Sequence, residues 1–338
     1  TAANASVSAG GNIVVSSGGT ASGTRISAGG TETISSGGTA SGTIVSSGGS
    51  EVVSAGGTAS GTTVQASANE IVRGTAAGLG VLGTATISSG GIASGTTVSS
   101  GGTLTLSSGA QLTGTTSVLT GGAVDLASGF TLNVGAGQTI GGVLVQSGAL
   151  EIVSSGGTTS DTTVQSGGTL ELLGGAQAIG ATTLNVGALE ILGSGYAASN
   201  LAIASGTTVE LLSGATLGGT TVIAAGGTLE IGSGFTVSGL TVSSGATFEV
   251  AASGVPALRY QWFHDGVPVP GGTTAQLGLS AVHLYDSGDW MVEITNSSGS
   301  ARSAVARLTV TLPRPSDAWS HRSPGGHPDL YGVGFGKG

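Results

Sequence analysis

The sequence predicts an all-β protein: a right-handed parallel β-helix (solenoid) of about 19-residue repeats, followed by a small β-sandwich. Two observations predict the solenoid. The heptapeptide GGTASGT starts at Gly18, Gly37 and Gly56, so it recurs with a constant period of 19. Short apolar alternations such as TLEL and TFEV end at turn signals such as SSGG and SAGG, which is the pattern of strands and turns. A third observation, a change of composition near residue 245, predicts the separate sandwich.

The composition fits a folded chain of low charge. Of 338 residues, 67 are Gly and only 7% are charged, yet the mean hydropathy is +0.36. Disordered chains are poor in apolar residues, so the Val, Ile, Leu and Ala content indicates a buried core. Cys is absent, which excludes disulfides and thiolate metal sites. No apolar run is long enough for a membrane-spanning helix.

Each repeat predicts one turn of a coil. A unit this short cannot close a core alone, so the units must stack and bury a continuous interior. About twelve turns at a spacing of roughly 4.8 Å predict a rod on the order of 60 Å long. Most neighbouring turn markers are one repeat apart, and the longer intervals, 56 to 90 and 129 to 156, indicate insertions or deletions. The markers are Gly37, Gly56, Gly90, Gly109, Gly129, Gly156, Gly175, Gly195, Gly214 and Gly234.

Charge and aromatic residues divide the chain. Residues 1–250 carry two Arg against eleven acidic residues, a net charge of −9, whereas residues 251–338 are neutral and hold all three Trp. A strongly acidic first part argues against nucleic acid as a partner, because phosphates need Lys and Arg. The predicted domains are 1–244 (β-helix), 245–312 (sandwich) and 313–338 (a flexible tail).

The wording of the repeats resembles a known family. SSGGTASGTTV and SSGGTLxL, which recur with the same period over about residues 6–247, are similar to the passenger repeats of AIDA-like autotransporter adhesins. The resemblance implies a bacterial solenoid that is displayed on the cell surface or secreted, and that acts in adhesion and self-association. It also implies O-linked heptose on repeat Ser and Thr residues.

The second part resembles a bacterial immunoglobulin-like domain, in the segments around RYQWFHDGVPVPGG and YDSGDWMVEITN. The resemblance implies that Trp262 packs across the sandwich core. It also places two Val residues where the disulfide cysteines would be, and a D-x-G-x-Y corner with Trp instead of Tyr, which removes the hydroxyl donor of that corner. These positions are Val250, Val292, Asp286, Gly288 and Trp290.

One set of charged residues follows the repeat. Glu32, Glu51 and Glu70 recur with the repeat period, and a second series of Glu follows at intervals of 19 or 20. On a coil this spacing predicts a ladder of carboxylates on one face, interpreted first as a solvated acidic stripe and second as a weak cation-binding site. The second series is Glu151, Glu171, Glu190, Glu210, Glu230 and Glu249.

Two functional classes remain open from the sequence. The first is a non-enzymatic adhesin or surface rod, extracellular or on the bacterial cell surface, with self-association or cell-surface glycans or proteins as partners. The second is a carbohydrate-active β-helix enzyme or a tailspike-like glycan-binding protein. Residues 1–250 contain only four aromatic residues with which to stack sugars, which favours the first class. No catalytic residue, cofactor site or firm metal site is expected.

Overall fold

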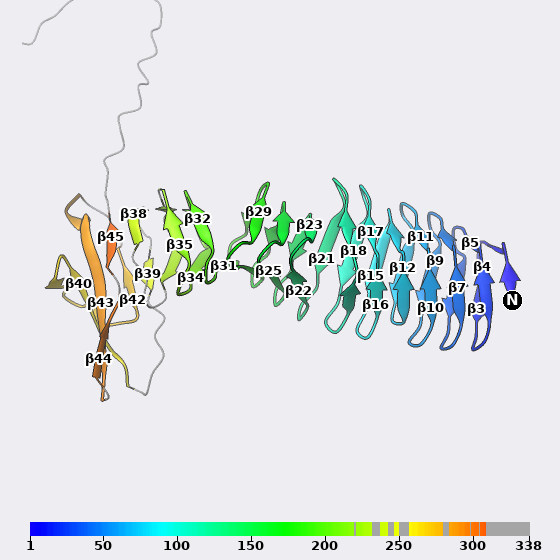
Figure 1. Cartoon of the computed structure of the whole chain (residues 1–338), viewed down its shortest axis with the longest axis horizontal. Coiled ribbons are helices and arrows are strands. Elements are labelled where there is room, and N and C mark those ends of the chain that lie inside the picture. Colours follow the sequence, from blue (N-terminus) through cyan, green and yellow to red (C-terminus); the bar gives the residue numbers. More distant parts are fainter. Residues whose placement is uncertain are drawn as a thin grey trace, which may run out of the picture.

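The computed structural model is a rod of stacked coils with an antiparallel sheet at its C-terminal end (Figure 1). It describes residues 1–219, 221–231, 237–242, 247–249, 257–279, 284–297, 299–303 and 305–308. The prediction of an all-β parallel solenoid of about 19-residue repeats is therefore confirmed. Within these residues the one helix is the 3-10 turn η1 (Leu284–Asp286).

Three parallel sheets form the first half of the rod, each strand pairing with its equivalent in the next coil. Sheet A contains β1 (Ala2–Ala3), β4 (Thr20–Ser22), β7 (Thr39–Ser41), β10 (Thr58–Ser60), β13 (Thr75–Ala77), β16 (Ile92–Ser94) and β19 (Gln111–Thr113). Sheet B contains β2 (Ser6–Val7), β5 (Arg25–Ile26), β8 (Ile44–Val45), β11 (Thr63–Val64), β14 (Gly80–Val81), β17 (Thr97–Val98) and β20 (Ser117–Val118). Sheet C contains β3 (Asn12–Val15), β6 (Thr31–Ile34), β9 (Ser50–Val53), β12 (Asn69–Val72), β15 (Thr84–Ile87), β18 (Thr103–Leu106), β21 (Ala123–Leu126), β24 (Val143–Val145), β27 (Thr163–Val164) and β30 (Thr183–Leu184).

Four further sheets complete the molecule. Sheet D contains β22 (Thr131–Val134), β25 (Leu150–Val153), β28 (Thr169–Leu172), β31 (Leu189–Leu192), β34 (Thr208–Leu211), β37 (Thr228–Ile231), β39 (Thr247–Glu249) and β42 (Gln276–Gly278). Sheet E contains β23 (Thr139–Gly141), β26 (Thr158–Ser160) and β29 (Gln177–Ile179), and sheet F contains β32 (Ala197–Ser199) and β35 (Thr216–Gly218). Sheet G contains β33 (Ala202–Ile203), β36 (Thr221–Ile223), β38 (Val237–Val242), β45 (Ala306–Leu308), β43 (Gly288–Asn296), β40 (Arg259–His264), β41 (Val267–Pro268) and β44 (Gly299–Arg302).

Many coils have glycine pairs at their corners, where successive coils approach closely. In SSGG the first glycine, Gly37, has φ +73°, a conformation that side chains with a Cβ rarely adopt. The second glycine, Gly38, lies so close to the preceding coil that a Cβ would collide with the carbonyl oxygen of Val15. The repeated glycines are therefore required by corner geometry and by coil spacing.

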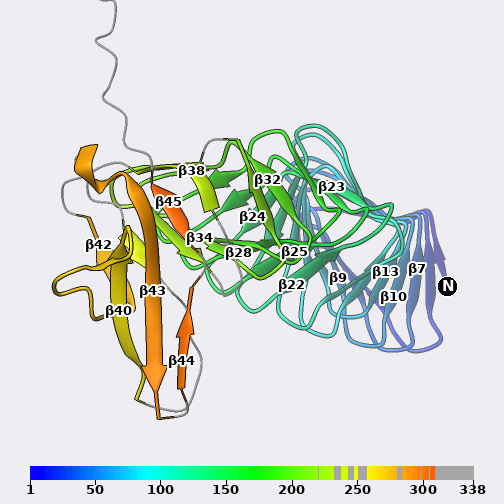
Figure 2. The same ribbon diagram turned by 60° about the vertical axis from the view of Figure 1, so that its left-hand side comes forward.

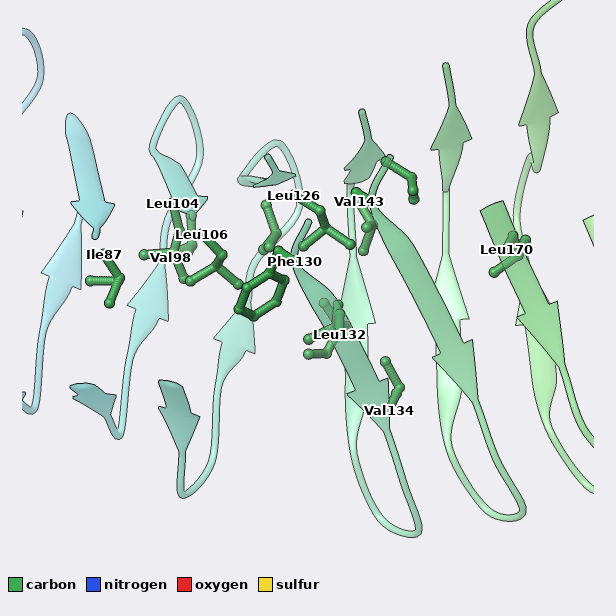
Figure 3. Close-up of a cluster of buried hydrophobic side chains, with 14 of the residues drawn as sticks. Ile87, Val98, Leu104, Leu106, Leu126, Phe130, Leu132, Val134, Val143 and Leu170 are labelled. Atoms are coloured by element: carbon green, nitrogen blue, oxygen red, sulfur yellow. The ribbon is translucent and has the colours of Figure 1, made fainter. Parts of the chain in front are cut away.

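A continuous row of aliphatic side chains fills the interior. The last residue of each four-residue strand in sheet C is buried, for example Ile34, Ile87 and Leu106. Figure 3 shows how such side chains from successive coils follow one another along the rod. Because strands alternate their side chains, the neighbours of these residues in the strand face outward.

The two irregular intervals have different structures. Between Gly56 and Gly90, two shortened coils carry the chain, because Thr58 pairs with Thr75 and Thr75 pairs with Ile92, both shorter steps than the regular period. Between Gly129 and Gly156, an additional four-residue strand, β22, follows β21 directly. Sheet C continues through this point from β21 to β24, whereas sheets A and B end and sheets D and E begin. From β22 onward, each strand of the repeat therefore joins the sheet next to the one that its equivalent joined in the earlier coils.

The C-terminal sheet is hydrogen-bonded to the rod and does not merely follow it. Strand β39 pairs in parallel with β37 of the last coils and antiparallel with β42. Strand β38 pairs in parallel with β45, which pairs antiparallel with β43 (Figure 2). The ambiguous segment TFE, Thr247–Glu249, therefore belongs both to the last coil and to the C-terminal sheet.

Candidate functional site

Glu32, Glu51 and Glu70 stack in register in sheet C, as their spacing predicts. The interpretation as a solvated stripe is wrong, because all three have 0% of their surface exposed. They occupy the second position of four-residue strands, which faces the core. In the same column Ile13 precedes them and Ala85 follows, so the carboxylates replace apolar core residues.

Two threonine hydroxyls donate to the first of these carboxylates. Thr24 Oγ1 donates to Glu32 Oε1 and Thr43 Oγ1 donates to Glu32 Oε2, both at 3.0 Å. In the described part of the chain, both oxygens of Glu51 and of Glu70 are buried without a hydrogen-bond partner. A buried carboxylate without donors is costly unless it is protonated.

Burial accordingly raises the pKa of each of these groups. The pKa of Glu51 rises from 4.5 to about 7 through burial and the charge of Glu32, while the nearby hydroxyls of Thr62 and Thr43 oppose the rise. The pKa of Glu70 is raised well above its usual value by burial and by the charge of Glu51. For Glu32, burial raises the pKa while the two threonine hydrogen bonds oppose the rise.

The second series of Glu does not form one ladder, which corrects the prediction. Glu151 and Glu190 occupy the second position of β25 and β31 and face the core, whereas Glu171 occupies the third position of β28 and is half-buried on the outer side. The register pairs Glu151 with Leu170, so Glu171 stands one position too late to continue the buried column. A shift of one position within a strand reverses the face of a side chain.

The outward column continues towards the C-terminal end of sheet D. Glu210 pairs in register with Glu230, and Glu230 with Glu249. Glu210 and Glu230 are half-buried. The side chain of Glu249 lies outside the described residues. A cation-binding role for this column stays a prediction, and no group of three potential metal ligands is present in the part of the chain that the structure describes.

Glu151 and Glu190 face the same core column but differ in their surroundings. Thr159 Oγ1 donates to Glu151 Oε1 at 2.7 Å and Thr162 Oγ1 donates to Glu151 Oε2 at 3.3 Å. No hydrogen bond to Glu190 exists among the described residues. Burial raises the pKa of both groups from 4.5 to about 7.

Rows of exposed hydroxyl groups follow the outer surface. Thr20, Thr39 and Thr58 begin successive strands of sheet A, pair in register, and are all exposed. Ser22 and Ser41 form a parallel exposed row two residues further along the same strands. The repeat thus places hydroxyls of adjacent coils about 4.8 Å apart.

The residues identified by the immunoglobulin-like resemblance form one cluster where they are described. Trp262 and Trp290 are buried, and Val292 lies opposite Trp262 in the pairing of β40 with β43. Trp290 Nε1 donates to the carbonyl oxygen of Asp286 at 2.9 Å. Gly288 begins β43 two residues before Trp290. Val250 and residues 313–338 lie outside the described residues.

Sequence reasoning missed the threonines that surround the buried carboxylates. Thr159 and Thr162 follow Glu151 by 8 and 11 residues, and Thr43 follows Glu32 by 11 residues. The signal was present as a threonine that recurs at the same place in many of the repeats, for example Thr24, Thr43 and Thr62. It could be interpreted only once the carboxylates were known to face inward.

Comparison with known proteins identifies the class. The family model described as "Adhesin of bacterial autotransporter system, probable stalk" matches residues 1–49. The crystal structure of a TibC-catalysed hyper-glycosylated TibA fragment is 30% identical, covering 74% of this chain and 89% of that chain, with a TM-score of 0.36. No curated protein sequence matched the chain. No helix among the described residues is long and apolar enough to cross a bilayer.

The two matches define an adhesin passenger, surface-exposed or secreted, built on a β-solenoid. The chain belongs to the AIDA-like family of bacterial autotransporter adhesins. The sequence identity over most of the TibA fragment, and not the superposition of the two structures, is the basis of this assignment. The class is non-enzymatic, so the adhesin alternative is confirmed over the carbohydrate-active enzyme.

Proposed function

We propose that the chain is an adhesive rod that associates laterally with copies of itself and contacts cell-surface glycans or proteins. The observation that carries the proposal is the repetition of similar outer side chains in successive coils, with exposed hydroxyl rows on sheet A and outward carboxylates on sheet D. A periodic surface on one rod can match the same surface on another over many coils. A weak contact per coil then adds up to a stable association.

The outward carboxylates control this association in our proposal. Glu171, Glu210 and Glu230 give neighbouring rods like charges, which repel. Millimolar divalent cations should neutralise this face and promote association. Sedimentation velocity of the purified chain with and without calcium tests this. The expected result is association that requires calcium in the native chain and no longer requires it when the three residues are changed to Gln. A variant with Glu151→Gln, which removes a buried carboxylate, should still require calcium.

We also propose that the exposed hydroxyl rows are O-glycosylated, as in the relative whose title describes TibC-catalysed hyper-glycosylation. Thr20, Thr39 and Thr58 satisfy the physical requirement, because an enzyme can reach an exposed hydroxyl. Buried threonines such as Thr43 and Thr162 serve as the contrast. Intact-mass and peptide analysis after co-expression with TibC should find sugar on exposed residues of the rows. Absence of sugar from them would contradict the proposal.

We further propose that residues 245–312 form an immunoglobulin-like domain that caps a right-handed coil, with residues 313–338 as a flexible tail. The buried Trp262, its position opposite Val292 and the corner bond from Trp290 to Asp286 support the domain. The strong preference of parallel strand connections for one hand supports the handedness. A crystal structure of the chain would test both, and a left-handed coil or a single-sheet end would contradict them.

A further inference from the structure

Two of the three sheets are interrupted at one level of the rod. Sheet E ends at β29 and sheet F begins at β32, while sheet C ends at β30 and sheet G begins at β33. Only sheet D continues across this level, through β31. A cleft of about 430 Å³ opens between the two coils and reaches the core, within the range of roughly 300–1,000 Å³ for small-molecule sites.

One aromatic residue, Tyr196, lies at this opening. Tyr196 N donates to Gly193 O in the corner turn, the same bond that Gly157 N and Ala176 N make in the two preceding coils. At Gly157 even a Cβ would collide with the carbonyl oxygen of Val134 in the coil before it. Ala176 in this column is accommodated with β26 and β29 still paired, whereas β29 and β32 no longer pair where the larger Tyr196 stands in the column.

Separation of the coils exposes positions that are buried elsewhere in the rod. Leu184 lies in register with Val164, which is 0% exposed, yet Leu184 is only half-buried. Ala198 and Leu201 on the opposite side of the cleft are also half-buried. The facing edges of β29 and β32, and of β30 and β33, form no strand ladder with each other, so their backbone donors and acceptors border the cleft.

Glu190 lines this cleft from the core side. It is 8% exposed, and no described residue donates a hydrogen bond to its carboxylate. The two threonines that satisfy Glu151 stand 8 and 11 residues after it, but the residues at these distances from Glu190 are Ala198 and Leu201. Glu190 is therefore a buried carboxylate that lacks the threonine donors of Glu151 and lines the cleft.

We infer that this cleft binds a neutral saccharide unit, with the Glu190 carboxylate accepting hydrogen bonds from sugar hydroxyls and the Tyr196 ring lying against the sugar. A sugar ring carries the donors that the carboxylate lacks, and its hydroxyls also match the unpaired strand edges. Hydrogen bonds to a carboxylate are stronger than those between neutral groups. Acidic sugars are excluded, because the sequence contains no Lys or Arg between Arg73 and Arg259 to compensate a second negative charge.

This saccharide site rests on the proposed contact with cell-surface glycans and places that contact in the cleft. Saturation-transfer NMR on the purified full chain tests it, with methyl glycosides of neutral hexoses and N-acetylhexosamines, glucuronic acid and methylammonium as probes. We expect saturation transfer to at least one neutral sugar and none to glucuronic acid. Glu190→Leu, which continues the apolar column of Leu170 and Val209, should reduce binding at least tenfold.

Two more variants separate binding from folding. Tyr196→Gly should close the cleft and abolish the signal, whereas Glu151→Leu removes a carboxylate from the same core column away from the cleft and should bind as the native chain does. No transfer to any neutral sugar, transfer to methylammonium alone, or unchanged binding by a folded Glu190→Leu variant would overturn the inference. Calcium-dependent association in sedimentation should persist in both cleft variants, so failure of the saccharide site is distinguishable from failure of the adhesive rod.

Discussion

Replacing Glu151 by Gln should remove a defined part of the pH dependence of stability. Glu151 is 0% exposed and burial raises its pKa to about 7. The amide has the same shape and can still accept a hydrogen bond from Thr159. The substitution therefore changes the titration of the site while largely preserving its packing.

The sign follows from proton linkage. The folded chain holds the Glu151 proton more tightly than the unfolded chain, whose reference pKa is 4.5. The stabilising contribution is therefore complete below about pH 4.5 and is lost as the pH rises through about 7. Between pH 5 and pH 8 this group alone should cost the native chain roughly 2–3 kcal/mol of unfolding free energy.

Urea unfolding, followed by far-UV circular dichroism at pH 5, 6, 7 and 8, measures this contribution. The difference in unfolding free energy between the native chain and Glu151→Gln should change by roughly 2–3 kcal/mol across the series, in favour of the variant at high pH. Glu171→Gln is the matched control, because Glu171 lies in the next coil of the same sheet but faces outward. The control should retain the native pH response.

Two results would refute this reasoning. The first is a native chain that is as stable at pH 8 as at pH 5, since Glu51 and Glu190 should act in the same direction as Glu151. The second is a Glu151→Gln variant with the full native pH response. Either result would mean that the carboxylates are not buried in the folded rod.

Four other substitutions test the packing. Leu192→Asp should lower the unfolding free energy by several kcal/mol, because it buries an unpaired carboxylate. Ile191 is half-buried on the outer side, so Ile191→Asp should lower the unfolding free energy by only about 1 kcal/mol. Thermal melts of the two variants measure the difference. Gly38→Ala should lower the melting temperature, because its Cβ collides with the carbonyl oxygen of Val15 in the previous coil. Trp262→Ala should destabilise the C-terminal sheet by about 3–5 kcal/mol, and hydrogen exchange should also accelerate in β38 and β39, which pair with that sheet.

The repeat period predicted the solenoid, its core and the stacking of Glu32, Glu51 and Glu70, because each depends only on equivalent positions recurring along the chain. The face of each Glu could not be predicted from spacing. LEIV at β25 places Glu151 second in its strand and TLEL at β28 places Glu171 third, so the start of the strand decides the face. The sequence shows the interval but not where the ladder begins.

The sequence also did not predict that the insertion forms an additional strand, β22. The distance from Gly129 to Gly156 indicates an insertion. The inserted strand and its corner place every later strand in the neighbouring sheet, although the local sequence pattern of those strands does not change. The domain boundary shows a related limit. Alternation assigns Phe248 of TFE inward in a coil or in a sandwich, and the structure uses the strand for both.

Two aromatic residues precede Phe235 in the sequence, Phe130 and Tyr196, and both lie where strand ladders of the rod are interrupted. Both occupy the corner position of the second glycine, and each follows a coil with alanine there, Ala110 or Ala176. A strand ladder ends at both places, between β19 and β22 and between β29 and β32, and a cleft lies beside each ring. Phe130 packs into the core between Leu106 and Leu132 where the coil shifts (Figure 3), whereas Tyr196 is half-exposed above a carboxylate that lacks donors. Glycine corners leave no room for a ring at the regular spacing. The position of an aromatic residue in the repeat, more than the number of such residues, therefore marks where the interior of such a rod becomes accessible.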